Sequence, residues 1–284
     1  MDTALPSISP AEFLQLARRP QRPLLLDVRR PAPFAASDRL LAGAVHCAPE
    51  DVAALANSGP PRDVIVYCVY GHNVSEDAVR TLRAAGWNAR ALQGGIEGGK
   101  PGEDQPEDIA RWRGTVLPSI RKRPDLGVTG ERPSRWITRA RPKIDRIACP
   151  WLVLRFIDPR ALFFYVPTEE VFAQAKQLEA VPYDIEGAPI THEWERCSFD
   201  TLMHAFELRD PALDTLAAIV RGADTSRLDL APQAAGLLAI SLGLSRLHAD
   251  DHAMLQAALP VYDALYAWCR EAQGETHTWK AHAA

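Results

Sequence analysis

Strand and helix signals alternate between residues 7 and 97, and this alternation limits the fold more than any other feature of the chain. Residues 64–67 form an apolar, β-branched run that predicts a buried strand. Val74, Ala78 and Leu82 then recur every four residues, which predicts a helix. The other elements predicted here are strands at residues 24–28, 44–46 and 89–92, and a helix at residues 11–18 that Ser9 caps. Such alternation predicts a mainly parallel α/β sheet.

Cys68 lies directly after the predicted strand at residues 64–67 and before the helix that follows it. Ligands of parallel sheets bind at the carboxyl ends of strands. Backbone N–H groups of a short loop and the positive end of a helix dipole both favour a thiolate and bound anions at such a place. The position therefore predicts a nucleophilic thiolate that handles anionic sulfur or oxyanion groups. The alternative is a cysteine that packs in the core as a small hydrophobic residue.

Length, charge and cysteine usage narrow the class of protein. A chain of 284 residues suits one large domain or two ordinary ones. The net charge of −4 gives no basic field that would attract nucleic acid, so direct nucleic-acid binding is not expected. No apolar run is long enough for a membrane span, and the first residues lack the pattern of a signal peptide. The five cysteines form no CxxC pair, which favours free thiols and a cytoplasmic location.

Composition divides the chain into three parts. Residues 1–100 carry the α/β pattern, and residues 101–134 are rich in glycine and proline, which predicts a linker. Residues 135–275 are predicted to form a second, helix-rich α+β domain. Its predicted elements are a strand at residues 162–166 and helices at residues 168–178, 199–206, 212–220, 232–247 and 250–269.

Four short motifs in the first part resemble the rhodanese (sulfurtransferase) family. They lie at residues 25–29, 41–45, 66–68 and 92–95. The resemblance implies an α/β rhodanese-like N-terminal domain in which Cys68 attacks a small anionic sulfur donor and carries a persulfide. It also implies an active-site loop whose backbone N–H groups surround that sulfur. The loop residues are Val69, Tyr70, Gly71, His72, Asn73 and Val74.

Two positions depart from the rhodanese pattern. Asn73 stands where many relatives carry a basic residue, and Gly98 stands where an aromatic residue often follows the closing glycines. A neutral Asn73 removes a charge that could hold thiosulfate, so thiosulfate is not expected to be the best donor. His72 adds a titratable group to the loop, or else points to solvent.

Long sequence strings in the second part resemble the C-terminal domain of the chromate-resistance (chromate-sensing) protein family. They lie at residues 136–151, 155–159, 197–200, 219–224, 233–240 and 262–269. These segments are rich in arginine and lysine, and guanidinium groups bind tetrahedral oxyanions such as chromate well. This predicts an oxyanion site built from Arg139, Arg146, Arg155 and His192. The alternative is that the arginines form ordinary ion pairs with neighbouring acids such as Asp145 and Asp158.

A metal site is a competing interpretation of the same part of the chain. One cluster of candidate ligands comprises His192, Glu193, Glu195, Cys197 and His204, and another comprises His248, Asp250, Asp251 and His252. Neither spacing matches a known zinc motif, and acidic residues at helix starts are often caps. We therefore predict no metal and no cofactor. Cys149 and Cys269 are predicted to pack in the core.

Taken together, the two resemblances predict a chromate-resistance protein with an oxyanion-responsive second domain. Its thiol chemistry at Cys68 would be that of a rhodanese-type sulfurtransferase or of a thiol-dependent oxyanion reductase. Its partners would be a small anionic sulfur donor or a chromate-like oxyanion, with a protein partner left open. The alternatives are a non-catalytic chromate sensor and an interaction module with a degenerate rhodanese domain.

Overall fold

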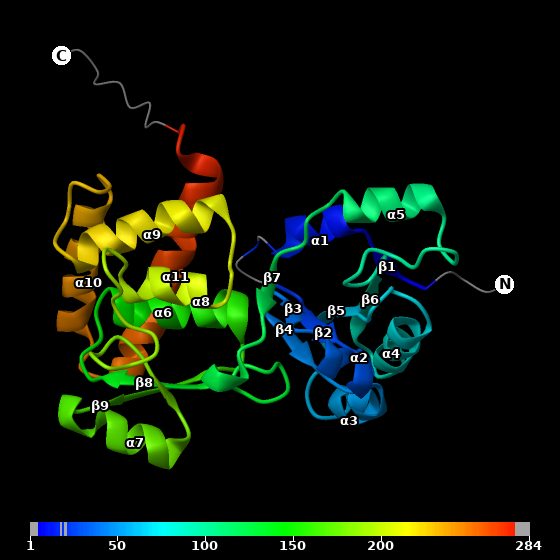
Figure 1. The fold of residues 1–284 in the computed structure, drawn as a ribbon, viewed down its shortest axis with the longest axis horizontal. Helices are drawn as coiled ribbons and strands as arrows, with labels where there is room; N and C mark the ends of the chain where they lie inside the picture. Colours follow the sequence, from blue (N-terminus) through cyan, green and yellow to red (C-terminus); the bar gives the residue numbers. More distant parts are fainter. Residues whose placement is uncertain (1–4, 18, 20–21, 276–284) are drawn as a thin grey trace, which may run out of the picture. The chain divides into compact units, whose positions relative to one another are not determined.

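The protein is described by a computed structural model that covers residues 5–17, 19 and 22–275. The chain divides into two compact units, which Figure 1 shows in the colours of the sequence. The first unit holds the chain up to Arg135 together with Leu152–Leu162 and Ala205–Leu208. The second unit holds Trp136–Trp151, Phe163–His204 and the chain from Arg209 onward.

The first unit is built on a parallel five-stranded sheet with the strand order β1-β6-β5-β2-β4. The strands are β1 (Ser7–Ile8), β2 (Leu24–Asp27), β4 (Ala44–His46), β5 (Asp63–Tyr67) and β6 (Asn88–Leu92). This confirms the parallel α/β sheet predicted from the alternation of strand and helix signals. The central strand β5 ends next to Cys68, so the cysteine does lie at the carboxyl edge of the sheet.

Successive side chains of β5 point to opposite faces of the sheet, and each face has its own core. Val64 and Val66 belong to one cluster of buried residues, and Ile65 and Tyr67 belong to the other. Figure 1 shows α1 on one side of the sheet and α3 and α4 on the other. The helices that accompany this sheet are α1 (Pro10–Ala17), α2 (Pro31–Ala36), α3 (Val52–Ala56) and α4 (Asn73–Ala84), with the 3-10 turn η1 (Pro49–Asp51).

Ser9 caps α1 as predicted, although Arg18, the last residue of the predicted helix, lies outside the described residues. The Ser9 N–H donates to the Glu12 carboxylate at 2.9 Å, and the Glu12 N–H donates to the Ser9 hydroxyl at 3.3 Å. These reciprocal bonds form a capping box, which satisfies N–H groups that the first helical turn leaves without partners.

The segment predicted as a linker contains regular structure of its own. It holds α5 (Pro106–Arg113), β7 (Ser119–Arg121) and the 3-10 turn η2 (Pro124–Leu126). Strand β7 pairs antiparallel with β3 (Arg39–Leu41), and Ile120 is fully buried. Pairing and burial of this kind place the segment within the first unit, which glycine and proline content alone did not reveal.

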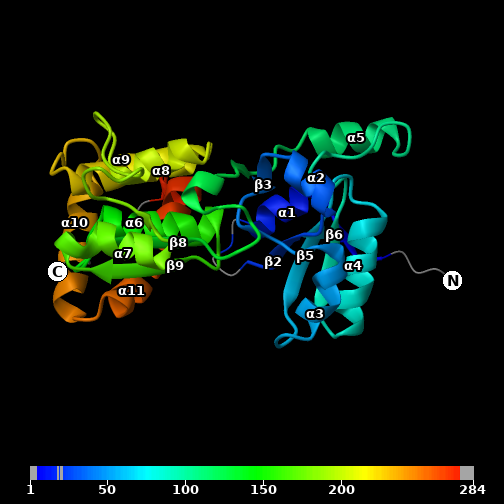
Figure 2. The same cartoon turned by 60° about the horizontal axis from the view of Figure 1, so that its bottom comes forward.

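The second unit contains a small three-stranded sheet with the strand order β10-β8-β9 and is otherwise helical. Figure 2 shows α7 running along this sheet, where Val171 and Ala175 pack with Ile137. The strands are β8 (Arg135–Arg139), β9 (Leu162–Val166) and β10 (Val181–Pro182). The helices are α6 (Asp145–Leu152), α7 (Val171–Leu178), α8 (Ser198–Ala205), α9 (Pro211–Asp224), α10 (Ala234–Leu247) and α11 (Asp251–Ala267), with η4 (Thr168–Glu170) and η5 (Trp268–Ala272). The π-helix η3 (Val153–Ile157), which follows α6, belongs to the first unit. The helix-rich α+β architecture predicted for this part is confirmed.

Trp151 is the centre of the aromatic core of the second unit. Its ring lies 6.4 Å from Phe199, 6.1 Å from Tyr262 and 5.7 Å from Tyr266, measured between centroids. Its indole N–H donates to Asp263 at 2.8 Å, so the buried polar atom has a partner. These ring contacts hold α6 against α8 and α11.

None of the described helices combines the length and the hydropathy that crossing a bilayer requires.

Candidate functional site

Cys68 is buried directly after β5, in the loop that leads to α4, with 6% of its surface exposed. The Ser75 hydroxyl lies 2.9 Å from Cys68 Sγ and donates a hydrogen bond to it. Sγ also lies 3.8 Å from the His72 carbonyl oxygen. Ser75 is itself fully buried in the first turn of α4, so its hydroxyl is held in place. The sulfur thus has a hydroxyl donor that comes from the N-terminal turn of a helix.

His72 is tied to the turn that precedes α5. Its Nε2 lies 2.9 Å from both carboxylate oxygens of Asp104, and its Nδ1 lies 3.4 Å from Glu103. Burial raises the pKa of Asp104, but hydrogen bonds from the Lys100 N–H and from His72 lower it overall. The imidazole is therefore bound to acidic side chains, although 33% of it stays exposed. This arrangement adds negative charge beside the Cys68 loop.

The closing glycines pack directly against the active-site loop. The Cys68 carbonyl accepts a hydrogen bond from Ile96 N at 3.0 Å. A Cβ on Gly95 would lie 2.6 Å from Cys68 O, Val69 O and Gly71 N, and Gly95 has a φ of +58°. Only glycine tolerates both the backbone conformation and this close approach. The motif at residues 92–95 thus supports the loop that carries the thiol.

A buried network braces the sheet beneath this loop. Arg29 and Asp27 are almost fully buried and form an ion pair at 2.7 Å. The Tyr67 hydroxyl donates to Asp27 at 2.8 Å. The two charged residues of the motif at residues 25–29 therefore satisfy each other inside the fold.

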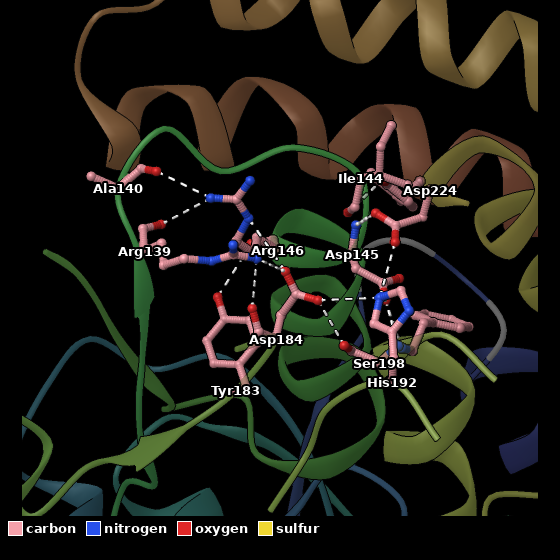
Figure 3. Close-up of polar contacts among 12 residues, drawn as sticks. Arg139, Ala140, Ile144, Asp145, Arg146, Tyr183, Asp184, His192, Ser198 and Asp224 are labelled. Atoms are coloured by element: carbon pink, nitrogen blue, oxygen red, sulfur yellow. Dashed lines mark hydrogen bonds and ion pairs between the residues drawn. The ribbon is translucent and has the colours of Figure 1, made fainter. Parts of the chain in front are cut away.

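Asp184 is the central anion of a second site, in the second unit (Figure 3). Its Oδ2 lies 3.2 Å from Arg139 Nη2 and 3.3 Å from Arg146 Nε, while its Oδ1 accepts a 2.7 Å hydrogen bond from the Ser198 hydroxyl. Burial raises the pKa of Asp184, but His192, Ser198, Arg146 and Arg139 together lower it. Two of the three arginines that were predicted to bind an oxyanion, Arg139 and Arg146, thus face a carboxylate of the protein itself.

His192 lies among three carboxylates. Its Nε2 is 3.1 Å from Asp224 Oδ2, 3.6 Å from Asp145 Oδ2 and 3.6 Å from Asp184 Oδ1. The hydrogen bond with Asp184 outweighs the effect of burial and, with the other carboxylates, raises the pKa of His192 to about 9. Burial, and then repulsion from Asp224 and Asp184, raises the pKa of Asp145 well above its usual range. We refer to Asp145, Asp184, His192 and Asp224 as the Asp–His cluster.

Local structure explains how the Asp–His cluster forms. Asp145 begins α6, and Ile144 before it has a φ of +41°, which is strained for a β-branched residue. Asp184 follows β10, also with a positive φ of +52°, and Asp224 ends α9. Asp145, Asp184 and His192 each offer one ligand atom, all within 4.8 Å of one another, as a metal site requires.

The predicted oxyanion residues do not form one site. Arg139, Arg146 and His192 meet around Asp184, whereas Arg155 lies in η3 and belongs to the first unit. Asp145 was predicted from the sequence only as a partner for arginines, and no role was predicted for Asp184 or Asp224. Asp145 and Asp224 lie within the family strings at residues 136–151 and 219–224, which is a signal that could have identified them.

The metal ligands considered from the sequence are mostly placed elsewhere. Glu193, Glu195 and His204 are exposed, and only His192 of that set lies in the Asp–His cluster. In the other set, Asp250 accepts a 2.7 Å hydrogen bond from Ala253 N and so caps α11.

The buried thiols Cys149, Cys197 and Cys269 have raised pKa values, mainly because of burial, and that of Cys269 is about 11.

Two known protein families match different parts of the chain. Residues 9–100 match the rhodanese-like domain, and residues 136–269 match the C-terminal domain of ChrB. The curated protein ChrB of Cupriavidus metallidurans (strain CH34) is 34% identical over 150 residues, which is 49% of this chain and 45% of that protein. The alignment thus spans less than half the length of this relative.

Solved structures similar to this chain include rhodanese homologues. A rhodanese homologue from the extremely thermophilic bacterium Thermus thermophilus is 28% identical over 32% of this chain and 98% of its own, with a TM-score of 0.27. A protein from Lactobacillus plantarum is 23% identical over 40% of this chain and 87% of its own, with a TM-score of 0.30. On the strength of its strand order and both domain matches, the chain joins a rhodanese-like domain to a ChrB C-terminal domain.

Proposed function

We propose that this chain is a chromate-resistance protein whose rhodanese-like domain carries sulfane sulfur on Cys68. The match to the ChrB C-terminal domain is consistent with chromate resistance. The observation that supports thiol chemistry is the hydrogen bond from the Ser75 hydroxyl to Cys68 Sγ at the start of α4. A hydroxyl donor and a helix N-terminus both stabilise an anionic sulfur atom, whether a thiolate or the terminal atom of a persulfide.

The proposed reaction moves one sulfur atom in two displacements. The Cys68 thiolate attacks the outer sulfur of the donor, so that an S–S bond forms at Sγ while the donor fragment leaves with the electron pair of the broken bond. An acceptor thiolate, or cyanide in an assay, then attacks the terminal sulfur. Cys68 leaves as a thiolate, so the cycle needs no external oxidant or reductant.

The charges around the loop favour a singly charged persulfide donor over thiosulfate. Asn73 contributes no positive charge, and Asp104 and Glu103 surround His72 on the other side of the loop. A doubly charged donor meets repulsion from these carboxylates, while a singly charged one meets less. We therefore expect the protein to accept sulfur from a small persulfide more readily than from thiosulfate.

Cyanolysis tests the proposal. The protein is loaded with polysulfide, desalted and treated with cyanide, and the thiocyanate formed is measured. We expect labile sulfur on the wild-type protein and on Cys47→Ser, because Cys47 is a half-buried thiol with a pKa raised to about 11, chiefly by burial. Cys68→Ser is expected to hold none. Thiocyanate from Cys68→Ser equal to that from the wild type would refute the assignment, and none from any variant would favour an interaction module.

A second candidate function, oxyanion recognition by the second unit, is supported by the convergence of Arg139 and Arg146. Both guanidinium groups lie within 3.3 Å of the same carboxylate oxygen, Asp184 Oδ2. A tetrahedral dianion would compete with Asp184 for this pair of donors, which suit oxyanions. The neighbouring Asp145 and Asp224 oppose such binding unless they are neutralised.

Calorimetric titration with chromate and with sulfate tests this second candidate. We expect Arg146→Gln to weaken chromate binding, and Arg160→Gln, which removes an arginine that pairs with Asp158 in the first unit, to leave it unchanged. Equal heats from the wild type and Arg146→Gln would remove the arginine pair from consideration.

A further inference from the structure

We infer that the Asp–His cluster is a binding site for one divalent metal ion, of the kind that carboxylate and imidazole ligands share, such as Mn²⁺. The proposal concerns the second unit only and does not depend on sulfur chemistry at Cys68. It rests on the convergence of four donor side chains, on the distances between them, and on one buried carboxylate oxygen that has no hydrogen-bond partner among the described residues.

Four separate segments supply the donors. Asp145 comes from the start of α6, Asp184 from the turn after β10, His192 from the following loop and Asp224 from the end of α9 (Figure 3). Asp145 and Asp224 are 79 positions apart in the sequence, yet Asp145 N lies 3.5 Å from Asp224 Oδ1. Like charges do not gather in a buried place without compensation.

The distances fit the edges of a coordination shell. Metal–ligand bonds of about 2.0 to 2.2 Å place neighbouring ligand atoms about 3.0 to 3.6 Å apart in octahedral or tetrahedral geometry. His192 Nε2 lies 3.1 Å from Asp224 Oδ2 and 3.6 Å from both Asp145 Oδ2 and Asp184 Oδ1. The ligand atoms of Asp145, Asp184 and His192 all lie within 4.8 Å of one another, so one ion could contact these three residues, and Asp224, whose Oδ2 lies 3.1 Å from His192 Nε2, could complete the shell after a side-chain movement.

Asp145 provides an independent observation. The residue is fully buried, and Figure 3 shows its carboxylate beside the His192 ring. Its Oδ2 accepts hydrogen bonds from the N–H groups of Ser198 and Phe199, but its Oδ1 has no hydrogen-bond partner within the part of the chain that the structure describes. A buried carboxylate oxygen without a partner is costly, and a cation bound by both oxygens of the Asp145 carboxylate would satisfy Oδ1 while also contacting Oδ2.

The surroundings hold the ligands in place. Arg139 and Arg146 bind Oδ2 of Asp184, and the Ser198 hydroxyl binds Oδ1, so Oδ1 is directed toward His192. Outer partners of this kind orient the groups that ligate a metal.

Oxygen-rich sites with one imidazole suit Mn²⁺, Fe²⁺ or Zn²⁺ better than soft ions such as Cu⁺, which prefer sulfur ligands.

The other interpretation of these contacts is a network of ion pairs around a charged His192 with no metal. The two interpretations differ in a measurable way, because only the first predicts a stoichiometric ion and a loss of binding when a single ligand is changed. Asp224 and His192 are the best positions for substitution, since their side chains are 18% and 44% exposed and their replacement disturbs the core least.

The experiment is titration of the full, chelator-treated chain with Mn²⁺, followed by the electron paramagnetic resonance signal of the free ion. We expect about one Mn²⁺ per chain, and a loss of affinity of about tenfold or more in His192→Ala and in Asp224→Asn. His204→Ala and Asp200→Asn are the matched controls, because they remove a histidine and an aspartate of the same unit outside the cluster and should bind as the wild type does.

Thermal unfolding gives a second readout for the same variants. A fixed concentration of Mn²⁺ should raise the Tm of the wild type and of both controls, and should raise that of His192→Ala by less, because the stabilisation grows with the ratio of ion concentration to Kd. No stoichiometric binding of Mn²⁺ or Zn²⁺ to the wild-type chain would overturn the proposal. Undiminished binding in His192→Ala and Asp224→Asn would overturn it too, since the ion would then sit elsewhere.

Discussion

At the scale of single residues, the surroundings of Cys68 and Cys47 differ. Cys68 is buried among apolar side chains of the sheet and α4. The Ser75 hydroxyl lies 2.9 Å from its sulfur and donates a hydrogen bond to it. Burial, followed by the charges of Asp51 and Glu50, raises the pKa of Cys47 to about 11.

We expect Ser75→Ala to slow sulfur loading of Cys68 by about tenfold, because a hydrogen bond to a charged group contributes about 1.5 kcal/mol or more. The measurement is the initial rate of polysulfide uptake, detected by cyanolysis. Thr81→Ala is the control, since that exposed hydroxyl of the same helix donates to the Asp77 carbonyl, away from the sulfur. Equal rates for Ser75→Ala and Thr81→Ala would contradict a role for Ser75.

Cys47 yields a pH prediction. A thiol with a raised pKa is protonated at pH 8 and becomes reactive as the pH approaches about 11. Alkylation of Cys47 by iodoacetamide, followed by mass spectrometry of its peptide, should therefore accelerate by about tenfold per pH unit between about pH 8 and 10. Asp51→Asn should increase the rate at about pH 8, because it removes a negative charge that disfavours the thiolate. A rate that is flat over this range would count against the raised pKa.

At the scale of elements, the turn after β6 and the loop after β5 form one supporting structure. The Cys68 carbonyl and the Val69 carbonyl accept hydrogen bonds from Ile96 N and Glu97 N, each at 3.0 Å. Gly95 lies where these two backbones approach most closely. The position of the thiol therefore depends on a turn that is remote from it in the sequence.

We expect Gly95→Ala to lower the free energy of unfolding by about 2 kcal/mol or more, because its Cβ would clash with the backbone of the Cys68 loop. Gly102→Ala is the matched control. Gly102 has a similar positive φ of +86°, but no described atom lies within 4 Å of an added Cβ, so it reports the conformational cost alone, about 1 kcal/mol. Urea denaturation measures both, and equal losses would show that the close approach has no energetic consequence.

At the scale of the whole molecule, the two candidate sites lie in different units. All contacts described for Cys68 lie in the first unit, and those of the Asp–His cluster lie in the second. Each site is completed by residues of its own unit, so neither needs the other for its local geometry.

We therefore expect the two sites to be separable in the full chain. Asp224→Asn should hold as much labile sulfur as the wild type, and Cys68→Ser should bind Mn²⁺ as the wild type does. Both measurements use the intact protein, with circular dichroism to confirm that each variant is folded. Loss of sulfur loading in Asp224→Asn would reveal a coupling between the units.

The sequence by itself determined the parallel sheet and the place of Cys68, because both follow from local periodicity. The run at residues 64–67 and the four-residue spacing of Val74, Ala78 and Leu82 specify a strand and a helix without any long-range contact, and β5 and α4 lie there. The glycine- and proline-rich segment after residue 100 was predicted only as a linker, because the pairing of β7 with β3 is not a local property.

Only the tertiary structure decided what surrounds the arginines and His192. Their cationic character was evident from the sequence, but the carboxylates that meet them come from Asp145, Asp184 and Asp224, on separate elements. Sequence spacing carries no information on such an encounter, since it depends on how β10, α6 and α9 pack. The same packing left Asp145 Oδ1 buried without a hydrogen-bond partner among the described residues, and it is this atom that points to a metal.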